Sequence, residues 1–367
     1  MAPERRVERL AQAVADEGLD ALIVGDLVTP GDSGPDAIAN VRWLTGFAGT
    51  SGLALVGPER REFLTDFRYA ERAERLVGDV FELVVFEGTI FKELGRRLRG
   101  QVGFDPAATS VRSHRKLSEA VGDRVELVAV EGLVERLRRV KDDEEIEAIA
   151  AAARLADDAL EWLLERGVVG KPERRVAFEL ETRIRELGAE PSFPTIVAAG
   201  PNGALPHAAP GEREIEPGEL VTIDWGAKLD GYCSDGTRTF ATGEIDTEQR
   251  DAYELVLRAQ RAGVEAVRAG ASGRNVDAVA RVLIEEAGMG ERFGHGLGHG
   301  VGLQVHEPPR LSRHSEDVLE AGNVVTVEPG VYVPGRFGIR IEDLVVVTPD
   351  GPPRNLSRLD KELQVIS

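Results

Sequence analysis

The chain has 367 residues, 42% of them hydrophobic, and a formal net charge of −19. This length favours two domains, and the acidity argues against nucleic acid or an anionic membrane surface as a partner, because both bind basic patches. No apolar run approaches the ~20 residues that span a bilayer, and no basic-then-apolar leader is seen. Cys233 is the only cysteine, which excludes an intrachain disulfide. We therefore expect a cytoplasmic protein.

Residues 1–137 alternate helix and strand patterns. Apolar residues at helical spacing predict a helix over 4–17. The sequence Gly-Pro-Glu at 57–59 predicts a hairpin between strands 53–57 and 62–65. We expect an α/β domain with a mixed sheet and no chemistry of its own, since its only histidine is His114. The other elements expected here are strands at 21–25, 81–86, 101–104 and 125–130 and a helix at 69–77.

Residues 138–367 are expected to form a second domain of α+β type. It opens with Asp142 and Asp143, which can cap a helix and suit the positive end of its dipole. Glycines and a proline mark the ends of the first helices. The helices expected in this domain span about 144–166, 173–187, 247–269 and 275–287.

Two segments of this second domain are nearly alike. Residues 218–224 read Gly-Glu-Leu-Val-Thr-Ile-Asp, and residues 322–328 read Gly-Asn-Val-Val-Thr-Val-Glu. Each is strand-like, ends in a carboxylate and is followed by a turn and a second carboxylate. The offset is too long for a solenoid, so we interpret the pair as an internal duplication whose halves face each other. The four acids are Asp224, Asp235, Glu328 and Glu342.

Hairpins can bring these four carboxylates into one cleft. Asp230-Gly231 separates the first pair, and residues 334–338 separate the second. Without cations the carboxylates would repel and at least one would stay protonated. Two divalent ions remove that penalty, and oxygen-rich ligation favours Mn²⁺, with Co²⁺, Fe²⁺ and Zn²⁺ as alternatives. Metals about 3.5–4 Å apart can hold a bridging hydroxide that attacks a carbonyl, so the chemistry expected is hydrolytic.

Histidines gather near this predicted site. His295 and His299 have the spacing of the zinc motif H-E-x-x-H, but no Glu follows His295 and the intervening glycines disfavour a helix. Glycines instead let the backbone approach closely and expose the imidazoles. His207 and His306 complete the set, whereas His314 is interpreted as a surface loop residue.

Together these segments resemble the pita-bread metallopeptidases, a family that includes methionine aminopeptidase, aminopeptidase P and prolidase. The resemblance covers about residues 140–360, and residues 1–137 are similar to a creatinase-type N-terminal domain. It implies a catalytic pita-bread domain with a pseudo-twofold duplication. The matching segments are Asn202 with Pro206-His207, Thr-Ile-Asp at 222–224, Ser-Asp-Gly-Thr-Arg-Thr at 234–239, His-Gly-Leu-Gly-His-Gly at 295–300, Val-His-Glu at 305–307, Glu-Pro-Gly-Val-Tyr at 328–332 and Ile-Arg-Ile-Glu-Asp at 339–343.

The resemblance implies a role for each acid. Asp224 would bind one metal, and His299 and Glu328 would bind the other. Asp235 and Glu342 would bridge the two ions. Glu328 lies where the family has its general base for the bridging water.

The resemblance also implies residues that contact the substrate. His207 and His306 would bind it and stabilise the tetrahedral intermediate, and His295 would support the site or shuttle protons. Arg340 and Tyr332 would orient the site from nearby and face the substrate. An ordinary strand salt bridge is the alternative interpretation of Arg340.

Within the family, the large first domain disfavours methionine aminopeptidase and suits enzymes that cleave before proline. In those enzymes the N-terminal domain of one subunit helps to close the active site of its partner, so we expect a homodimer. Residues 306–310 read His-Glu-Pro-Pro-Arg and resemble a prolidase stretch whose arginine holds the carboxylate of a dipeptide. The expected function is therefore hydrolysis of Xaa-Pro dipeptides, a small peptide substrate.

Three alternatives stay open. If Arg310 is a solvated loop charge, an aminopeptidase P that acts on longer Xaa-Pro peptides becomes favoured. A creatinase-like hydrolase of another C–N bond shares the fold but uses no metal. A non-enzymatic binding protein of the same fold would lack several ligands, whereas this chain carries the complete set.

Overall fold

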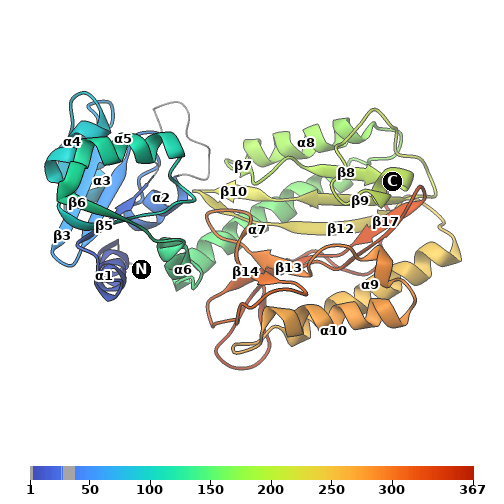
Figure 1. Ribbon diagram of the computed structural model, residues 1–367. Helices are drawn as coiled ribbons and strands as arrows, with labels where there is room; N and C mark the ends of the chain where they lie inside the picture. Colours follow the sequence, from blue (N-terminus) through green and yellow to red (C-terminus); the bar gives the residue numbers. More distant parts are fainter. Residues whose placement is uncertain (1–2, 26, 28–37) are drawn as a thin grey trace. The chain divides into compact units, whose positions relative to one another are not determined.

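The chain divides into two compact units, Met1–Arg138 and Arg139–Ser367. The computed structural model describes residues 3–25, 27 and 38–367 (Figure 1). Among these residues, no helix is both long and apolar enough to cross a membrane.

A six-stranded sheet forms the middle of the first unit. Its strands are β1 (Ala21–Val24), β2 (Leu53–Gly57), β3 (Arg60–Thr65), β4 (Glu82–Val85), β5 (Gly100–Phe104) and β6 (Val125–Ala129). They lie in the order β4-β3-β2-β1-β5-β6. β1 pairs antiparallel with β2 and parallel with β5, which confirms the mixed sheet. Gly57 pairs with Arg60, so the expected hairpin closes with a two-residue turn.

Helices pack around this sheet. α1 and α3 match the two helices expected from the sequence, and Val7, Leu10 and Val14 form the buried face of α1. Four further helices were not expected. Two of them carry ordinary start signals, since Thr89 caps α4 and Ser110 caps α5 through their side chains. The helices are α1 (Pro3–Asp16), α2 (Ala39–Thr45), α3 (Ala70–Val77), α4 (Ile90–Arg97), α5 (Val111–Val121) and α6 (Leu133–Arg138), with a 3₁₀ turn η1 (Gly122–Arg124).

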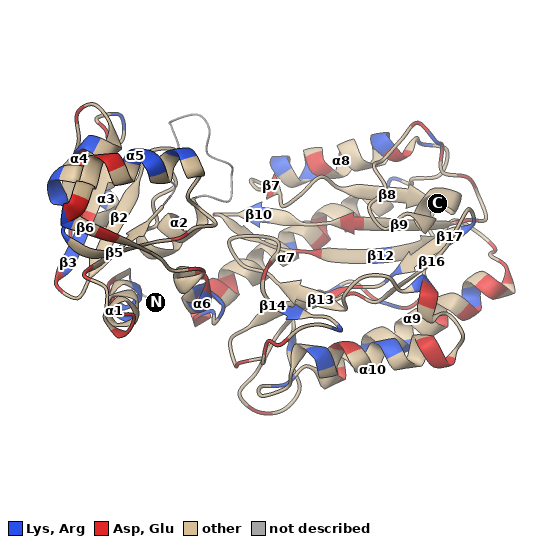
Figure 2. Cartoon of the chain, in the orientation of Figure 1, with Lys and Arg blue, Asp and Glu red and all other residues tan. Residues whose placement is uncertain are grey.

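The second unit contains the four helices that the sequence predicts. They are α7 (Asp143–Leu164), α8 (Glu173–Glu186), α9 (Thr247–Ala266) and α10 (Gly273–Glu286). Asp142 begins α7 as its N-cap and forms a capping box with Glu145. Figure 2 shows both signs of charge along α8, α9 and α10, as expected for helices with one solvated face.

The strands of the second unit fall into two successive groups. The first group is β7 (Glu190–Pro191), β8 (Ile196–Ala199), β9 (Leu220–Trp225), β10 (Ala227–Leu229), β11 (Tyr232–Cys233) and β12 (Gly236–Ala241), with η2 (Gly200–Ala204). The second group is β13 (Gly298–Gly300), β14 (Glu307–Leu311), β15 (Val324–Val327), β16 (Gly330–Val333), β17 (Phe337–Arg340), β18 (Asp343–Val346) and β19 (Arg354–Asn355), preceded by η3 (Gly290–Arg292).

Each group contains the same nested hairpin. β9 pairs with β12 around the inner pair β10–β11, and β15 pairs with β18 around the inner pair β16–β17. Asp230 and Gly231 both have positive φ, 46° and 84°, as a type I′ turn at the first tip requires. The acids lie where the outer pair meets the inner one. This repeated plan is the internal duplication expected from the two similar segments.

Each half has a core between its strands and a pair of helices, and α7 also packs against strands of the second group. Leu160, Leu180 and Val221 belong to the core under α7 and α8. Val256, Ile284 and Val325 belong to the core under α9 and α10. Figure 1 shows α8 and α10 on opposite sides of the strands. The acidic strand junctions therefore face the middle of the unit, between two covered outer faces.

The halves touch closely where β17 meets η2. A Cβ added at Gly338 would lie 1.8 Å from the Gly203 carbonyl oxygen. The Thr222 hydroxyl donates to the Gly338 carbonyl at 3.3 Å and links β9 to the same point. Only a residue without a side chain permits this approach.

We predict that Gly338→Ala destabilises the second unit by about 1–3 kcal/mol, because the backbones must separate to admit the methyl group. Urea unfolding of the purified protein measures this as a lower midpoint. Gly294→Ala is the matched control, since nothing lies within 4 Å of the Cβ added there and Gly294 has no left-handed φ. Equal midpoints for the two variants would contradict the prediction.

Candidate metal centre

One cavity of about 430 Å³ in the second unit collects the residues predicted to bind metal or substrate. The strand junctions supply the acids, and segments 206–207 and 295–312 supply the other polar groups. The predicted residues that line it are His207, Asp224, Asp235, His295, His299, His306, Arg310, Glu328, Tyr332, Arg340 and Glu342.

The cavity also has an apolar wall that the sequence analysis did not single out. The wall consists of Phe193 and Ile196, and Pro206, the neighbour of His207, also lines the cavity. Ile196 lies opposite Asp224 in the pairing of β8 with β9, which brings this wall beside the acids. No local sequence signal marks these residues, because their place depends on the register of β8.

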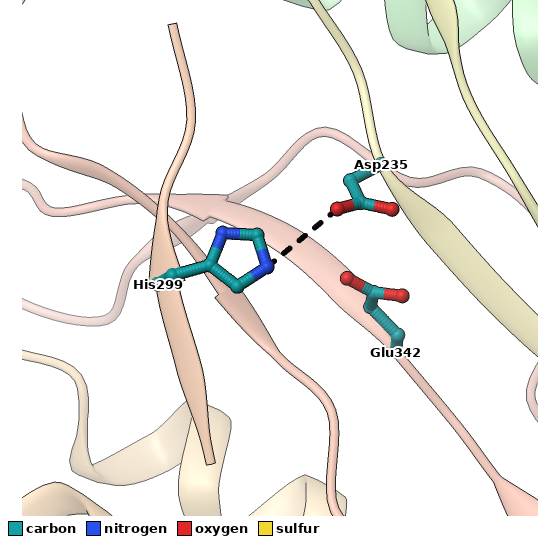
Figure 3. A group of neighbouring side chains, drawn as sticks. All are labelled: Asp235, His299 and Glu342. Atoms are coloured by element: carbon teal, nitrogen blue, oxygen red, sulfur yellow. Dashed lines mark ion pairs between the residues drawn. The ribbon is translucent and has the colours of Figure 1, made fainter. Parts of the chain in front are cut away.

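Asp235, His299 and Glu342 form the closest group in the cavity. Their candidate ligand atoms all lie within 4.8 Å of one another, and Figure 3 shows the three side chains pointing toward a common point. His299 Nε2 lies 3.6 Å from Asp235 Oδ2 and 3.2 Å from Glu328 Oε1. Three different chain segments thus bring an imidazole and three carboxylates together.

Asp224 stands apart from that group in its contacts. Its Oδ2 accepts a hydrogen bond from Arg340 Nη2 at 2.5 Å. Its Oδ1 is buried and, within the described residues, has no hydrogen-bond partner. Glu342 shows the same pattern, since Oε2 accepts from the Thr237 hydroxyl at 2.7 Å while Oε1 is buried without a partner there.

Buried acceptors without partners are costly, and a cation is the kind of partner that a carboxylate oxygen takes. Among the described residues that line the cavity, two such oxygens belong to Asp224 and Glu342, one from each half of the duplication. The donor set combines carboxylate oxygens with the single imidazole of His299 and no thiolate. These residues therefore fit a divalent metal ion that prefers oxygen ligands.

The acids perturb one another electrostatically. Burial raises the pKa of Asp235 well above its ordinary value, and the neighbouring carboxylates raise it further. Burial and the charges of Glu328 and Asp224 raise the pKa of Glu342 in the same way. Burial also acts to raise the pKa of Glu328, but the hydrogen bond and charge of His299 outweigh it and lower that pKa to about 2.

The backbone around His299 aims its imidazole at the acids. Nδ1 lies 3.1 Å from the Gly300 carbonyl oxygen, to which it can donate its proton, and this orientation turns Nε2 toward the carboxylates. β13 comes very close to β15 here, since a Cβ at Gly298 would lie 2.0 Å from the Thr326 carbonyl oxygen. The Thr326 hydroxyl also accepts from the His299 amide at 3.1 Å.

A chain of hydrogen bonds connects His295 to the acids. His295 Nε2 lies 3.0 Å from the Tyr332 hydroxyl, which accepts from Arg340 Nη1 at 2.9 Å. Arg340 in turn donates to Asp224. Burial lowers the pKa of His295, so this imidazole is neutral at neutral pH. Arg340 forms an ion pair with Asp224, and both residues line the cavity. The alternative interpretation, an ordinary strand salt bridge, therefore describes the contact but not its location.

His306, His207 and Arg310 lie farther from the acids. The His306 ring is 4.2 Å from the His299 ring. Burial and the charges of His299 and Arg310 lower the pKa of His306 to about 4. His207 and Arg310 are exposed at the mouth of the cavity.

A buried carboxylate that the sequence analysis missed holds the segment that carries His207. Glu173, at the start of α8, accepts from the Asn202 side-chain amide at 2.9 Å. It also accepts from the backbone amides of Ala199 and Gly211, at 2.8 and 3.1 Å, on either side of His207. An acid in the first turn of a helix is common, so its position gives no sequence signal of this role.

Comparison with known proteins identifies the family. Residues 147–349 match metallopeptidase family M24, and residues 6–140 match the Creatinase/Prolidase N-terminal domain. The chain is 44% identical over 239 residues to the Xaa-Pro dipeptidase of Pyrococcus furiosus, which covers 65% of this chain and 68% of that one. The chain belongs to metallopeptidase family M24.

Solved structures agree over nearly the whole chain. The Xaa-Pro dipeptidase from Bacillus anthracis superposes with a TM-score of 0.91 at 39% identity, covering 99% of both chains. The X-Pro aminopeptidase from Thermotoga maritima gives a TM-score of 0.88 at 34% identity, covering 98% of this chain and 99% of that one. These findings confirm the expected fold class, a creatinase-type first domain and a pita-bread catalytic domain, and they confirm a peptidase that binds divalent metal.

The raised pKa values of Asp235 and Glu342 predict that the metal-free protein gains stability as the pH falls from 8 to about 6.5, below which the lowered pKa values of His295 and His306 act in the opposite direction. Asp235 and Glu342 have raised pKa values in the folded state, so folding is penalised above those values and the penalty disappears below them. Thermal unfolding after treatment with a chelator should show a melting temperature that rises by a few degrees. Saturating Mn²⁺ should reverse the trend, because protons then compete with the ion.

Asp235→Asn provides the control for this measurement. It removes one of the two charges, so the metal-free variant should melt higher than the metal-free wild type at pH 8 and should depend less on pH. Identical pH dependence in the two proteins would show that these carboxylates do not govern the stability of the metal-free form.

Proposed function

We propose that this chain hydrolyses the peptide bond before proline in short Xaa-Pro peptides, with dipeptides preferred. The observation that carries the proposal is the grouping of Asp235, His299 and Glu342 within 4.8 Å at the base of a small cavity, with Arg310 at its mouth. The names of its relatives, Xaa-Pro dipeptidase and X-Pro aminopeptidase, support the same substrate class.

Two divalent ions are proposed for the site, with Mn²⁺ preferred and Co²⁺, Fe²⁺ or Zn²⁺ as alternatives. Asp224 would hold one ion, and His299 with Glu328 would hold the other. Asp235 and Glu342 would each contact both ions. When bound, such a pair lowers the pKa of a water molecule and polarises the scissile carbonyl. The ions would also satisfy the partnerless oxygens of Asp224 and Glu342.

The protein's own groups would handle the protons. The pKa of Glu328 is low, so this carboxylate is ionised at neutral pH and can accept the proton of the attacking water. His306 is neutral and lies beside His299, so its N–H can donate to the oxygen that becomes negative in the transition state. His207 can donate from the mouth, and His295 can relay protons through Tyr332.

Charge would orient the substrate. The N-terminal ammonium of a peptide is attracted to the acids near Asp224, beside the apolar wall of Phe193 and Ile196. The C-terminal carboxylate of a dipeptide would then face Arg310, which offers a planar, bidentate donor pair. A volume of about 430 Å³ lies in the range of small-ligand sites, which suits a substrate of two residues.

We further propose that the protein acts as a homodimer in the cytoplasm. The resemblance to enzymes whose subunits share active sites supports the dimer, and a single cysteine suits a reducing compartment. Analytical ultracentrifugation of the full chain tests the dimer directly. A monomer at micromolar concentration with full activity would overturn it.

We predict metal-dependent hydrolysis of Ala-Pro and Leu-Pro, lost after chelation and restored by Mn²⁺ or Co²⁺. Asp235→Asn and Glu342→Gln should each reduce kcat/KM by about a thousandfold or more, because they remove groups that hold the ions. Metal analysis of the purified variants should show fewer bound ions than the wild type. Failure of the wild type to cleave any Xaa-Pro peptide, with metals added, would refute the proposed function.

Arg310→Met tests the preference for dipeptides. Loss of a charged hydrogen-bond donor costs about 1.5–3 kcal/mol, so KM for Leu-Pro should rise about 10- to 100-fold. Hydrolysis of Leu-Pro-amide and of a longer Leu-Pro peptide should change little, since neither places a carboxylate beside Arg310. A wild type that cleaves the longer peptide and spares Leu-Pro would instead identify an aminopeptidase of the X-Pro type.

A further inference from the structure

The segment that carries two of the site histidines is unusually rich in glycine. Residues 294–300 read Gly-His-Gly-Leu-Gly-His-Gly. Glycine loses more conformational freedom on folding than any other residue, so such a segment does not hold its side chains in place by itself. His295 and His299 therefore need an external support.

That support comes from a buried ion pair on α10. Arg281 Nε and Nη2 donate to Asp277 Oδ2 and Oδ1 at 2.6 and 2.8 Å. The two residues are only 5% and 1% exposed. They lie one helical turn apart, so the bidentate pair is fixed by the helix before it meets any other group.

The pair binds the glycine-rich segment by its backbone on both sides of His295. Arg281 Nη1 donates to the Phe293 carbonyl at 2.9 Å, and Nη2 donates to the His295 carbonyl at 2.7 Å. Asp277 Oδ1 accepts from the Leu297 amide at 3.0 Å. Phe293, His295 and Leu297, at the start of the segment and just before it, are thereby held to one helix.

Ring contacts continue the support to the imidazole. The Arg281 guanidinium lies 4.0 Å from the centre of the Phe293 ring, and the Phe293 ring packs edge-on against His295 at 5.1 Å. His295 then contacts the Tyr332 hydroxyl, which Arg340 joins to Asp224.

We infer that Asp277 and Arg281 are positioning residues for the peptidase reaction, which set the place of His295 and, through Tyr332, of the acids. Neither side chain lines the catalytic cavity, so they act through the backbone of residues 293–297. The inference rests on the proposed function, because its main measurement is peptide hydrolysis.

Stability alone does not explain such a pair. Replacing a buried ion pair by apolar residues of similar volume is often neutral or stabilising, because burial of two charges costs about as much as their attraction returns. What an apolar pair cannot supply is the set of three backbone hydrogen bonds. The position of the His295 backbone, and with it of the imidazole, is therefore the property that depends on Asp277 and Arg281.

This difference gives a test with the double variant Asp277→Leu/Arg281→Met. We expect it to fold and to bind metal as the wild type does, while kcat for Leu-Pro falls about 10- to 100-fold, as for a catalytic group displaced by about 1 Å. KM should change less than about threefold, since Arg310 is unaltered. Arg281→Lys, which keeps the charge and one donor group, should recover part of the lost kcat.

Arg213→Met/Glu219→Leu is the matched control. Arg213 and Glu219 also form a bidentate pair in the second unit, at 2.7 and 2.6 Å, and also bind backbone groups, at Glu214 and Glu216. They do not line the catalytic cavity. This control should keep the kcat of the wild type at temperatures where it is folded.

A second readout separates positioning from a general loss of structure. Burial lowers the pKa of His295, and release of residues 293–297 from α10 would expose its imidazole, so NMR titration should show a higher pKa of His295 in the double variant and an unchanged one in the control. A folded double variant with the kcat and the His295 titration of the wild type would overturn the inference. If the wild type cleaves no Xaa-Pro peptide, the proposed function fails while the NMR titration still decides the positioning.

Discussion

Mutual repulsion of buried carboxylates is the constraint on which the second unit depends. Burial raises the pKa of Asp235 and Glu342, and each carboxylate adds to the penalty on the others. A cluster of buried carboxylates is stable only if positive charge offsets the repulsion, and a divalent metal ion is the partner that the donor set fits. Arg340 and His299 offset part of the charge from within the protein, at Asp224 and Glu328. The repulsion that remains among the carboxylates is relieved when divalent ions bind, so it contributes to the free energy of metal binding.

The duplicated nested hairpin is the structural answer to that constraint. Each half places two acids where an outer strand pair meets an inner one, and each half covers its outer face with two helices. The repulsive groups therefore lie on well-packed backbones that cannot move apart. Buried charges on those helices then hold the segments that carry two of the site histidines. Glu173 on α8 holds the segment of His207, and Asp277 with Arg281 on α10 holds the segment of His295.

Local signals in the sequence were sufficient for much of this architecture. Four long helices of the second unit and the two acidic strand junctions follow from periodicity, capping residues and the repeated segment. The short helices α2, α4 and α6 were missed, because about two turns carry little periodic signal, and α5 was missed although it has 11 residues and a Ser110 cap. The apolar wall of Phe193 and Ile196 and the Asp277–Arg281 pair were missed for another reason. Their partners lie elsewhere in the chain, and no spacing rule connects them.

The sequence by itself determined the chemistry of this protein, because residue types carry it. Four acids in two similar segments, histidines among glycines and an arginine after a proline pair already indicate a metal-dependent hydrolase. Only the tertiary structure decided which of those groups contact one another. It set Asp224 against Arg340, aimed Nε2 of His299 at the acids and joined His295 to Tyr332. Such pairings depend on distances of a few ångströms between distant segments, and packing of the whole unit sets them.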